Sequence, residues 1–250
     1  IGTIGGLAYY NDVKWDIYNT SNSILGSNNI GSIYVDGVDN SVAIGTINGG
    51  LTLIDATGWT PYTIWNSNLP DNTILSLEED SSGVLWMATP AAGLSAHTGG
   101  FSFLTLNTAS SSIASNSLTS ISIAPDESIW ASSNDSGIIK KEGLNFFTYN
   151  TNNSPLPDNF VHTVLTDDQG IVWIGTSQGG LVRFDESLFL PVTEIKNVSF
   201  LQLFPVPANE FFTIKSNSQK SFQLMVFDTF GKTIEQVSAI SFLNTATVKT

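Results

Sequence analysis

The segment that decides the fold is Val172-Trp173-Ile174-Gly175-Thr176, followed by Gly179-Gly180-Leu181. Close copies of it recur along the chain at Ile1-Gly2-Thr3 with Gly5-Gly6-Leu7, Val42-Ala43-Ile44-Gly45-Thr46 with Gly49-Gly50-Leu51, Leu85-Trp86-Met87-Ala88-Thr89 with Ala92-Gly93-Leu94, and Ile129-Trp130-Ala131-Ser132-Ser133 with Ser136-Gly137-Ile138. Successive copies lie 43, 43, 44 and 43 residues apart. A period of about 40–50 residues with β-type sequence is typical of β-propeller blades. Helical repeats would show apolar residues at i, i+3 and i+4, and that pattern does not appear.

Each repeat predicts four strands. The first strand alternates apolar and polar residues, and we expect it at Ile30–Val35, Ile74–Leu77, Leu118–Ile123 and Val161–Val164. A tight turn precedes the second strand, and Gly-Gly-Leu leads into the third. The fourth strand is aromatic and is expected at Trp15–Tyr18, Tyr62–Trp65, Phe103–Leu106 and Phe146–Tyr149. Four blades are therefore predicted, at Ile30–Ser67, Leu69–Thr108, Leu118–Thr151 and Leu156–Asp185, with equivalent tryptophans packed between them at Trp86, Trp130 and Trp173.

The predicted fold class is all-β, with four-stranded propeller blades in an incomplete ring and a C-terminal β-sandwich-like segment. Residues 1–192 would hold a partial first blade, three full blades and one further blade, and residues 193–250 a truncated second β domain. Because the first repeat starts at its second strand, we expect the chain to be a piece of a longer protein that completes the ring.

The composition excludes several classes of function. The formal net charge is -13, Arg183 is the only arginine, and the basic residues are scattered apart from Lys140-Lys141. Phosphate neutralisation needs clustered Lys and Arg, so nucleic acid is not expected as a partner. The absence of cysteine removes disulfides and thiolate chemistry. No apolar run approaches the roughly 18 residues of a membrane span.

The repeat resembles the two-component-regulator propeller family. The pattern of that family is an alternating strand, Asp-x-x-Gly, a Trp-Ile-Gly-Thr strand, Gly-Gly-Leu and an aromatic strand. The match is closest at Leu156–Asp185 and good at Leu69–Thr108, whereas Ala43 replaces the tryptophan in one copy and Ser132-Ser133 replaces Gly-Thr in another. The resemblance implies an extracytoplasmic propeller that binds a ligand at the ring axis or top face, and it carries no catalytic motif.

The C-terminal segment resembles the sorting domain of the type IX secretion system. The residues that carry the resemblance are Leu203-Phe204-Pro205-Val206-Pro207-Ala208, Phe211-Phe212-Thr213-Ile214 and Gln223–Lys232, which ends in Asp-x-x-Gly-Lys. Val206 stands where the family usually has Asn, and the closing Gly-x-Tyr strand is missing. The resemblance implies the secretion machinery as a partner, and a secreted or cell-surface location in a Gram-negative bacterium.

No residue stands out as catalytic, cofactor-binding or metal-binding. His97 and His162 lie at unrelated positions of different blades and are interpreted as structural. The motif Thr166-x-Asp168-x-Gly170-x-x-Trp173 matches the Asp-box turn of sialidase-like propellers, but that chemistry needs several arginines. Glu78-Glu79-Asp80 and Asp167-Asp168 are sequence neighbours at hairpin turns and are interpreted as solvated.

The aromatic residues Trp59, Trp65, Tyr9 and Tyr10 fall within or beside strands, so packing between blades is expected, with sugar stacking as the alternative. The chain is therefore predicted to be a non-catalytic recognition or scaffold module without a cofactor, with an unknown protein or glycan ligand. Two alternatives stay open. One is an extracytoplasmic glycan sensor of a two-component system, and the other is an accessory domain of a larger secreted hydrolase.

Overall fold

The structure is a computed structural model that describes residues 1–186 in full and the backbone of strands at 201–204, 211–216, 222–227, 233–240 and 245–249. The chain divides into two compact units, Ile1–Glu186 and Ser187–Thr250. Every regular element assigned in the described residues is a strand. The predicted all-β class is confirmed, while the proposed domain boundary after residue 192 falls among residues 187–200, outside the described residues.

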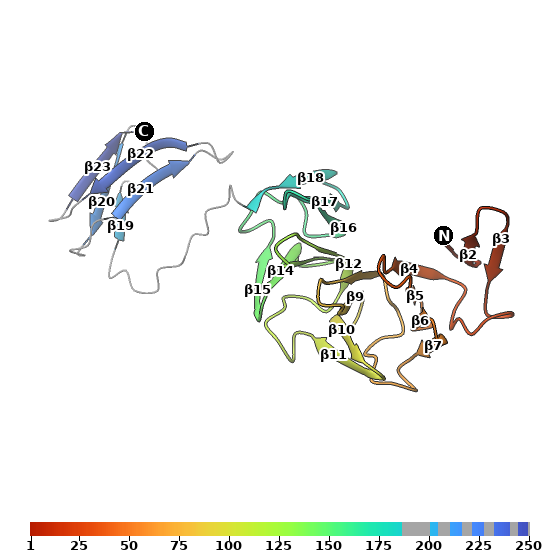
Figure 1. Cartoon of the computed structure of the whole chain (residues 1–250). Coiled ribbons are helices and arrows are strands. Elements are labelled where there is room, and N and C mark those ends of the chain that lie inside the picture. Colours follow the sequence, from red (N-terminus) through yellow and green to blue (C-terminus); the bar gives the residue numbers. More distant parts are fainter. Residues whose placement is uncertain (187–200, 205–210, 217–221, 228–232, 241–244, 250) are drawn as a thin grey trace. The chain divides into compact units, whose positions relative to one another are not determined.

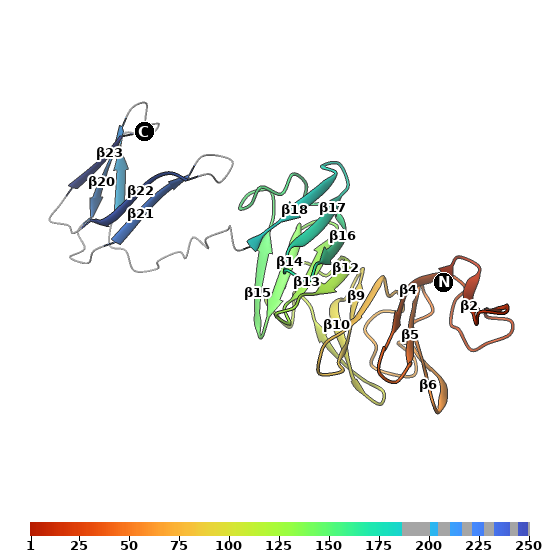
Figure 2. The same ribbon diagram turned by 45° about the horizontal axis from the view of Figure 1, so that its top comes forward.

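The first unit is a series of antiparallel sheets that we number as blades 1 to 5 (Figures 1 and 2). Their strands are β1 (Gly2–Thr3), β2 (Gly6–Tyr10) and β3 (Trp15–Tyr18) in blade 1; β4 (Ile30–Val35), β5 (Val42–Thr46), β6 (Leu51–Asp55) and β7 (Gly58–Tyr62) in blade 2; β8 (Ser76–Glu79), β9 (Leu85–Thr89), β10 (Gly93–Gly99) and β11 (Ser102–Leu106) in blade 3; β12 (Leu118–Ile123), β13 (Ile129–Ser133), β14 (Ile138–Glu142) and β15 (Asn145–Tyr149) in blade 4; and β16 (Val161–Thr166), β17 (Val172–Thr176) and β18 (Leu181–Phe184) in blade 5. Blades 2 to 4 have four strands in chain order, as a propeller requires.

The core lies between successive sheets, because one sheet cannot bury both of its faces alone. Trp86 packs with Ile121, Ala131 and Ile139 between blades 3 and 4. Trp130 lies edge-on to Phe184 of blade 5, with ring centroids 5.8 Å apart. The prediction that the tryptophans occupy equivalent places between blades is therefore confirmed for Trp86 and Trp130. Trp173 is only half-buried, because no further sheet covers its face among the described residues.

The Gly-Gly-Leu turn requires its second glycine. Gly50, Gly93 and Gly137 have φ of +82°, +84° and +80°. A Cβ on Gly50 would lie 2.1 Å from the carbonyl oxygen of Tyr62, the last residue of the fourth strand. The Thr or Ser that closes the second strand caps this turn with its hydroxyl, as in the 2.9 Å bond from Thr46 Oγ1 to the Gly50 carbonyl. The repeat motif is therefore a turn that lets the third and fourth strands approach closely.

The crossing loops between blades repeat one hydrogen-bond pattern. In each loop an asparagine accepts a backbone N–H through Oδ1 at 2.8–2.9 Å: Asn28 from Thr20, Asn72 from Ile64, Asn116 from Thr108 and Asn159 from Thr151. The same loops show that the fourth strand predicted at Tyr62–Trp65 is wrong. It ends at Tyr62, because Thr63 opens a turn in which its N–H binds Asn66 Oδ1 at 2.7 Å. Ile64 and Trp65 continue the apolar pattern of the strand in the sequence, but they lie in that turn.

The second unit holds a three-stranded sheet and a two-stranded sheet, both antiparallel. The first contains β19 (Leu201–Phe204), β20 (Phe211–Ser216) and β23 (Thr245–Lys249), and the second contains β21 (Phe222–Phe227) and β22 (Thr233–Ile240). β20 lies between β19 and β23, so the chain leaves this sheet to form the β21–β22 hairpin and then returns. The predicted β character of the C-terminal segment is confirmed.

Candidate functional site

The hydroxyl groups of the inner strands join neighbouring blades. Thr119 Oγ1 of β12 donates to the carbonyl of Val161 in β16 at 2.7 Å. Ser122 Oγ lies 2.9 Å from Thr166 Oγ1, and Thr166 Oγ1 donates to the carbonyl of Ile123 at 2.9 Å. On the other side of β12, Ser76 Oγ accepts the N–H of Ile121 at 3.2 Å. These hydrogen bonds connect the inner strands of neighbouring blades.

Two of the hairpin turns between first and second strands are capped by an aspartate that also holds the tryptophan. Asp80 Oδ1 accepts the N–H of Val84 at 3.0 Å, and its Oδ2 accepts Trp86 Nε1–H at 2.8 Å. In blade 5, Asp167 binds Trp173 Nε1–H at 3.1 Å, and this bond lowers the pKa of Asp167. The aspartate that stabilises this turn is therefore Asp167, and not Asp168, which the Asp-box motif contains.

The acids at the end of β8 do not form a catalytic pair. Glu78 is half-buried, and burial raises its pKa. Burial also raises the pKa of Glu79, with further contributions from the carboxylates of Asp36, Asp39 and Asp80. Adjacent strand residues point to opposite faces of a sheet, so the two side chains diverge. Glu78-Glu79-Asp80 was interpreted as a run of solvated turn residues. Glu78 differs from that interpretation, because its side chain is half-buried and partly desolvated.

The two histidines lie in unrelated surroundings. His97, in β10, sits beside Tyr62 and Phe103, and its Nε2 lies 2.9 Å from the Gly100 carbonyl. His162, in β16, is exposed and meets Phe160 edge-on. Within the part of the chain that the structure describes, no group of three or more His, Cys, Asp or Glu could hold a metal ion. Their structural role remains a prediction.

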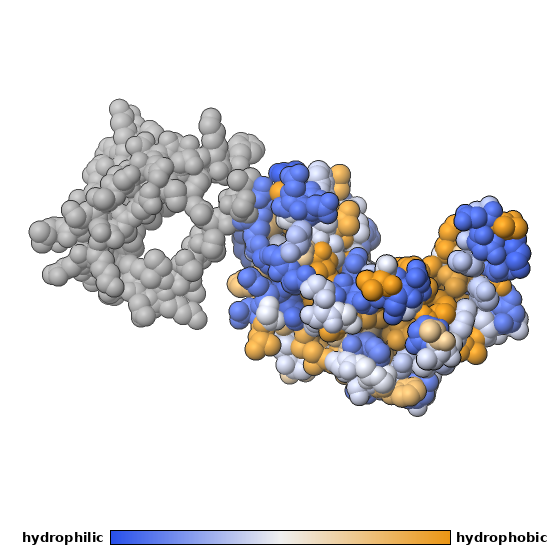
Figure 3. All heavy atoms as spheres, viewed as in Figure 1, coloured by the Kyte–Doolittle hydropathy of each residue, from blue (hydrophilic) through white to orange (hydrophobic). Residues whose placement is uncertain are grey.

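The aromatic residues divide into packed and exposed groups. Trp59 packs against Tyr18 across blades 1 and 2, with ring centroids 5.1 Å apart, as expected. Trp65 is 78% exposed because it lies in the turn after β7, and Tyr9 and Tyr10 are exposed on blade 1. The packing prediction is wrong for these three. Figure 3 shows apolar surface interspersed with polar surface over the first unit.

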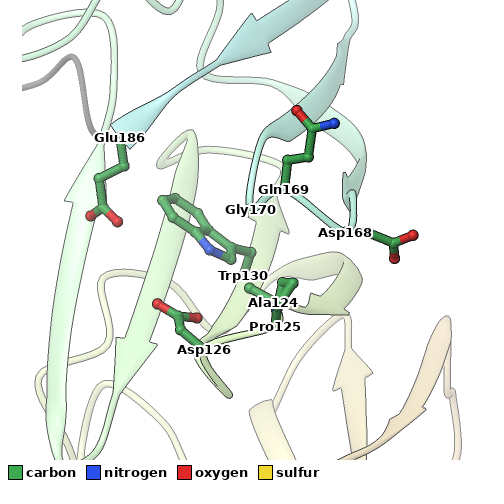
Figure 4. A pocket seen from close by; sticks show the side chains of 8 residues that line it. All are labelled: Ala124, Pro125, Asp126, Trp130, Asp168, Gln169, Gly170 and Glu186. Atoms are coloured by element: carbon green, nitrogen blue, oxygen red, sulfur yellow. The ribbon is translucent and has the colours of Figure 1, made fainter.

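A cavity of about 290 Å³ lies between blades 4 and 5 (Figure 4). Its walls are Trp130 and the Ala124–Asp126 turn of blade 4, the Asp168–Gly170 turn of blade 5, and Glu186. Behind it, Glu186 accepts bonds from Lys140 Nζ at 2.6 Å and from Tyr149 Oη at 2.5 Å. In the sequence, Lys140 is notable only as half of the basic pair Lys140-Lys141.

Strand alternation separates that basic pair. Lys140 faces blade 5 and is 5% exposed, with its ammonium 5.6 Å from the Trp130 ring centroid. Lys141 faces the other way and lies over Trp86 at 4.7 Å. Burial opposes the charge of Lys140, but Glu186, Asp126 and Glu142 more than compensate, so its pKa is raised. Burial and the bond to Glu186 raise the pKa of Tyr149. Lys140 is therefore a cation at neutral pH.

Comparison with known families supports both resemblances. The description "Two component regulator propeller" matches residues 68–91 and 155–178, and "Secretion system C-terminal sorting domain" matches residues 202–250. Both predicted families are confirmed at these residues. No curated protein matches the chain.

Solved structures with this architecture include proteins of several kinds. The extracellular domain of the hybrid two component system BT3049 from B. thetaiotaomicron is 19% identical with a TM-score of 0.67, covering 99% of this chain and 38% of its own. PorZ, a bacterial surface component of the type-IX secretion system of Porphyromonas gingivalis, is 13% identical with a TM-score of 0.56, covering 95% and 36%. Virginiamycin B lyase from Staphylococcus aureus, solved with quinupristin, is 15% identical with a TM-score of 0.56, covering 76% and 65%.

These likenesses establish the propeller fold. The chain spans about a third of the length of the two component extracellular domains that it matches. The match to the secretion system sorting domain at residues 202–250 confirms the predicted location, which is secreted or on the cell surface of a Gram-negative bacterium. Among the described residues, none forms a helix of the length and apolarity that a bilayer crossing needs.

Proposed function

We propose that this secreted propeller is a non-catalytic recognition or scaffold module whose C-terminal sorting domain delivers it through the type IX machinery. The observation that carries the proposal is the use of the inner-strand hydroxyls. Thr119, Ser122 and Thr166 bind neighbouring blades, so they support the ring and not a reaction centre. Enzymes gather several perturbed titratable groups in one pocket, whereas here the two histidines and the acid pairs are dispersed.

A recognition role also fits the surface of the first unit. His162, Thr163 and Leu165 of β16 are exposed, and so is Val35 of β4. These side chains offer hydrogen bonds and apolar contact without strong charge. Such a mixture is typical of surfaces that bind a protein or a glycan. The partner is thus expected at the exposed side of the inner strands or at the end face of the ring.

The purified chain is expected to show no turnover on a panel of glycoside, ester, peptide and phosphate substrates. The physical reason is that neither histidine of residues 1–186 lies beside a nucleophile, because His97 contacts rings and a carbonyl, and His162 contacts Phe160. Release of product is followed for each substrate, with His162→Ala as the matched variant. Turnover that disappears in His162→Ala would show that the protein is an enzyme.

Export is expected to depend on the C-terminal unit. A reporter fused to residues 187–250 should reach the medium or the cell surface in a bacterium with a type IX system. It should stay inside an isogenic strain that lacks the system, because the sorting match covers residues 202–250. The control reporter carries residues 1–186. Equal export of the two reporters would contradict this half of the proposal.

A further inference from the structure

The turn of blade 4 lacks the aspartate that caps the corresponding turns of blades 3 and 5. Asp80 and Asp167 each stand six residues before a tryptophan and accept its indole N–H. The residue six positions before Trp130 is Ala124. Among residues 1–186, no hydrogen-bond acceptor contacts Trp130 Nε1, although Trp130 is only 2% exposed. This indole N–H is therefore a donor that residues 1–186 leave unpaired and that the acceptor group of a bound ligand would satisfy.

The cavity between blades 4 and 5 lies where that carboxylate is missing. Both Ala124 and Trp130 line it. No fully buried side-chain nitrogen lacks a partner in the described residues, so the indole nitrogen must reach open space, and the cavity is the space beside it. Figure 4 shows Ala124 and Asp126 on one side of the Trp130 ring and Glu186 on the other.

The turn itself is also altered. Gly83 and Gly170 occupy the positive-φ position of the corresponding turns, with φ of +77° and +78°, whereas blade 4 has Glu127 there with φ of +66°. Such a conformation in a non-glycine residue stores strain and often marks a functional site. Glu127 Oε2 accepts the N–H of Ser81 of blade 3 at 3.3 Å, so its side chain turns away from the cavity.

The charges around the cavity select the ligand. Asp126, Asp168 and Glu186 line it, and the Lys140 ammonium behind it is already paired with Glu186 at 2.6 Å and with Asp126 at 3.8 Å. Burial opposes ionisation of Asp126, but hydrogen bonds from Ser128 lower its pKa, so it is a carboxylate at neutral pH. The walls therefore repel anions. A bare ammonium would satisfy Asp126 but could not accept the indole N–H. A hydroxyl group does both.

We propose that this cavity binds one ring of a neutral polyhydroxylated molecule, such as a monosaccharide unit, with a hydroxyl that accepts from Trp130 Nε1 and donates to Asp126. The volume of about 290 Å³ lies at the lower end of small-molecule sites, which span roughly 300–1,000 Å³. It accommodates one sugar ring, not a chain. The site lies between two blades, so it is independent of a partner at the end face of the ring.

The test is titration of the whole chain with glucose, galactose, mannose and N-acetylglucosamine, followed by calorimetry and ligand-observed NMR. At least one sugar should bind, with lactate, an anion that also carries a hydroxyl, as the negative probe. Trp130→Phe keeps the ring but removes the N–H, and Ala124→Asp places a carboxylate where blades 3 and 5 have one. Each should weaken binding at least tenfold. Asp135→Ala, at an exposed turn of the same blade, should leave it unchanged.

Circular dichroism and thermal melting separate loss of the site from loss of the fold. If Trp130→Phe unfolds the protein, Asp126→Ala gives the second test, because it removes the acceptor of the ligand hydroxyl from the exposed wall of the cavity. Failure of all four sugars to bind the folded chain, or equal binding by Ala124→Asp, would overturn the proposal. Neither result would affect the turnover or export experiments.

Discussion

Replacing Trp130 by Ala is expected to destabilise the first unit by about 3–5 kcal/mol, the usual loss when a buried Trp or Phe is truncated. Trp130 is 2% exposed and is enclosed by Tyr149, Phe184 and the Lys140 ammonium. Its removal opens a void between blades 4 and 5 and also takes away one wall of the Lys140–Glu186 pair. Urea denaturation followed by circular dichroism gives the free energy of unfolding.

Trp173→Ala is the matched control, because it occupies the same place in the repeat. Trp173 is half-buried, and no sheet covers its outer face among the described residues. The loss should therefore be smaller, about 1–2 kcal/mol from the apolar area involved. Equal losses at the two positions would mean that the repeat equivalence, and not burial between blades, determines the stability.

The architecture was predictable from the sequence because the backbone conformation of each blade requires the same residue types at the same positions of the repeat. The second glycine of the Gly-Gly-Leu motif has positive φ, and a Cβ added there would clash with a carbonyl oxygen of the fourth strand, so this glycine recurs in every copy with a third and fourth strand. The fourth strand of blade 2 was predicted too long because Ile64 and Trp65 continue its apolar pattern from Tyr62 into a turn. Only the bond from the Thr63 N–H to Asn66 Oδ1 shows where the strand ends.

The candidate site was much less predictable. Its acids come from separate repeats, and Glu186 lies 46 residues from Lys140, its partner. The fold follows from what the repeats share, whereas the cavity depends on a difference between them, Ala124 in place of the turn aspartate. Aligning Asp80, Ala124 and Asp167 by their distance to the following tryptophan would have exposed that difference. It could not have shown that Glu186 lines the same cavity.

Replacing Gly137 by Ala is expected to cost about 3 kcal/mol or more, among the largest effects of a single methyl group in this protein. Gly137 has φ of +80°, and an added Cβ would lie 2.3 Å from the Tyr149 carbonyl oxygen and 3.0 Å from Leu156 Cδ2. The methyl group can be accommodated only if β14 and β15 separate or the crossing loop moves. Either change would break the bond from the Gly137 N–H to the Asn159 carbonyl, at 3.0 Å.

Gly143→Ala separates backbone strain from contact. Gly143 also has positive φ, +57°, but nothing lies within 4 Å of an added Cβ, because it sits in the open hairpin between β14 and β15. Left-handed backbone strain alone costs about 1–2 kcal/mol. Chemical denaturation of the two variants should therefore show a clearly larger loss for Gly137→Ala. Similar losses would mean that the close approach of the Tyr149 carbonyl is relieved without cost, and that the glycine of this motif is needed only for its backbone conformation.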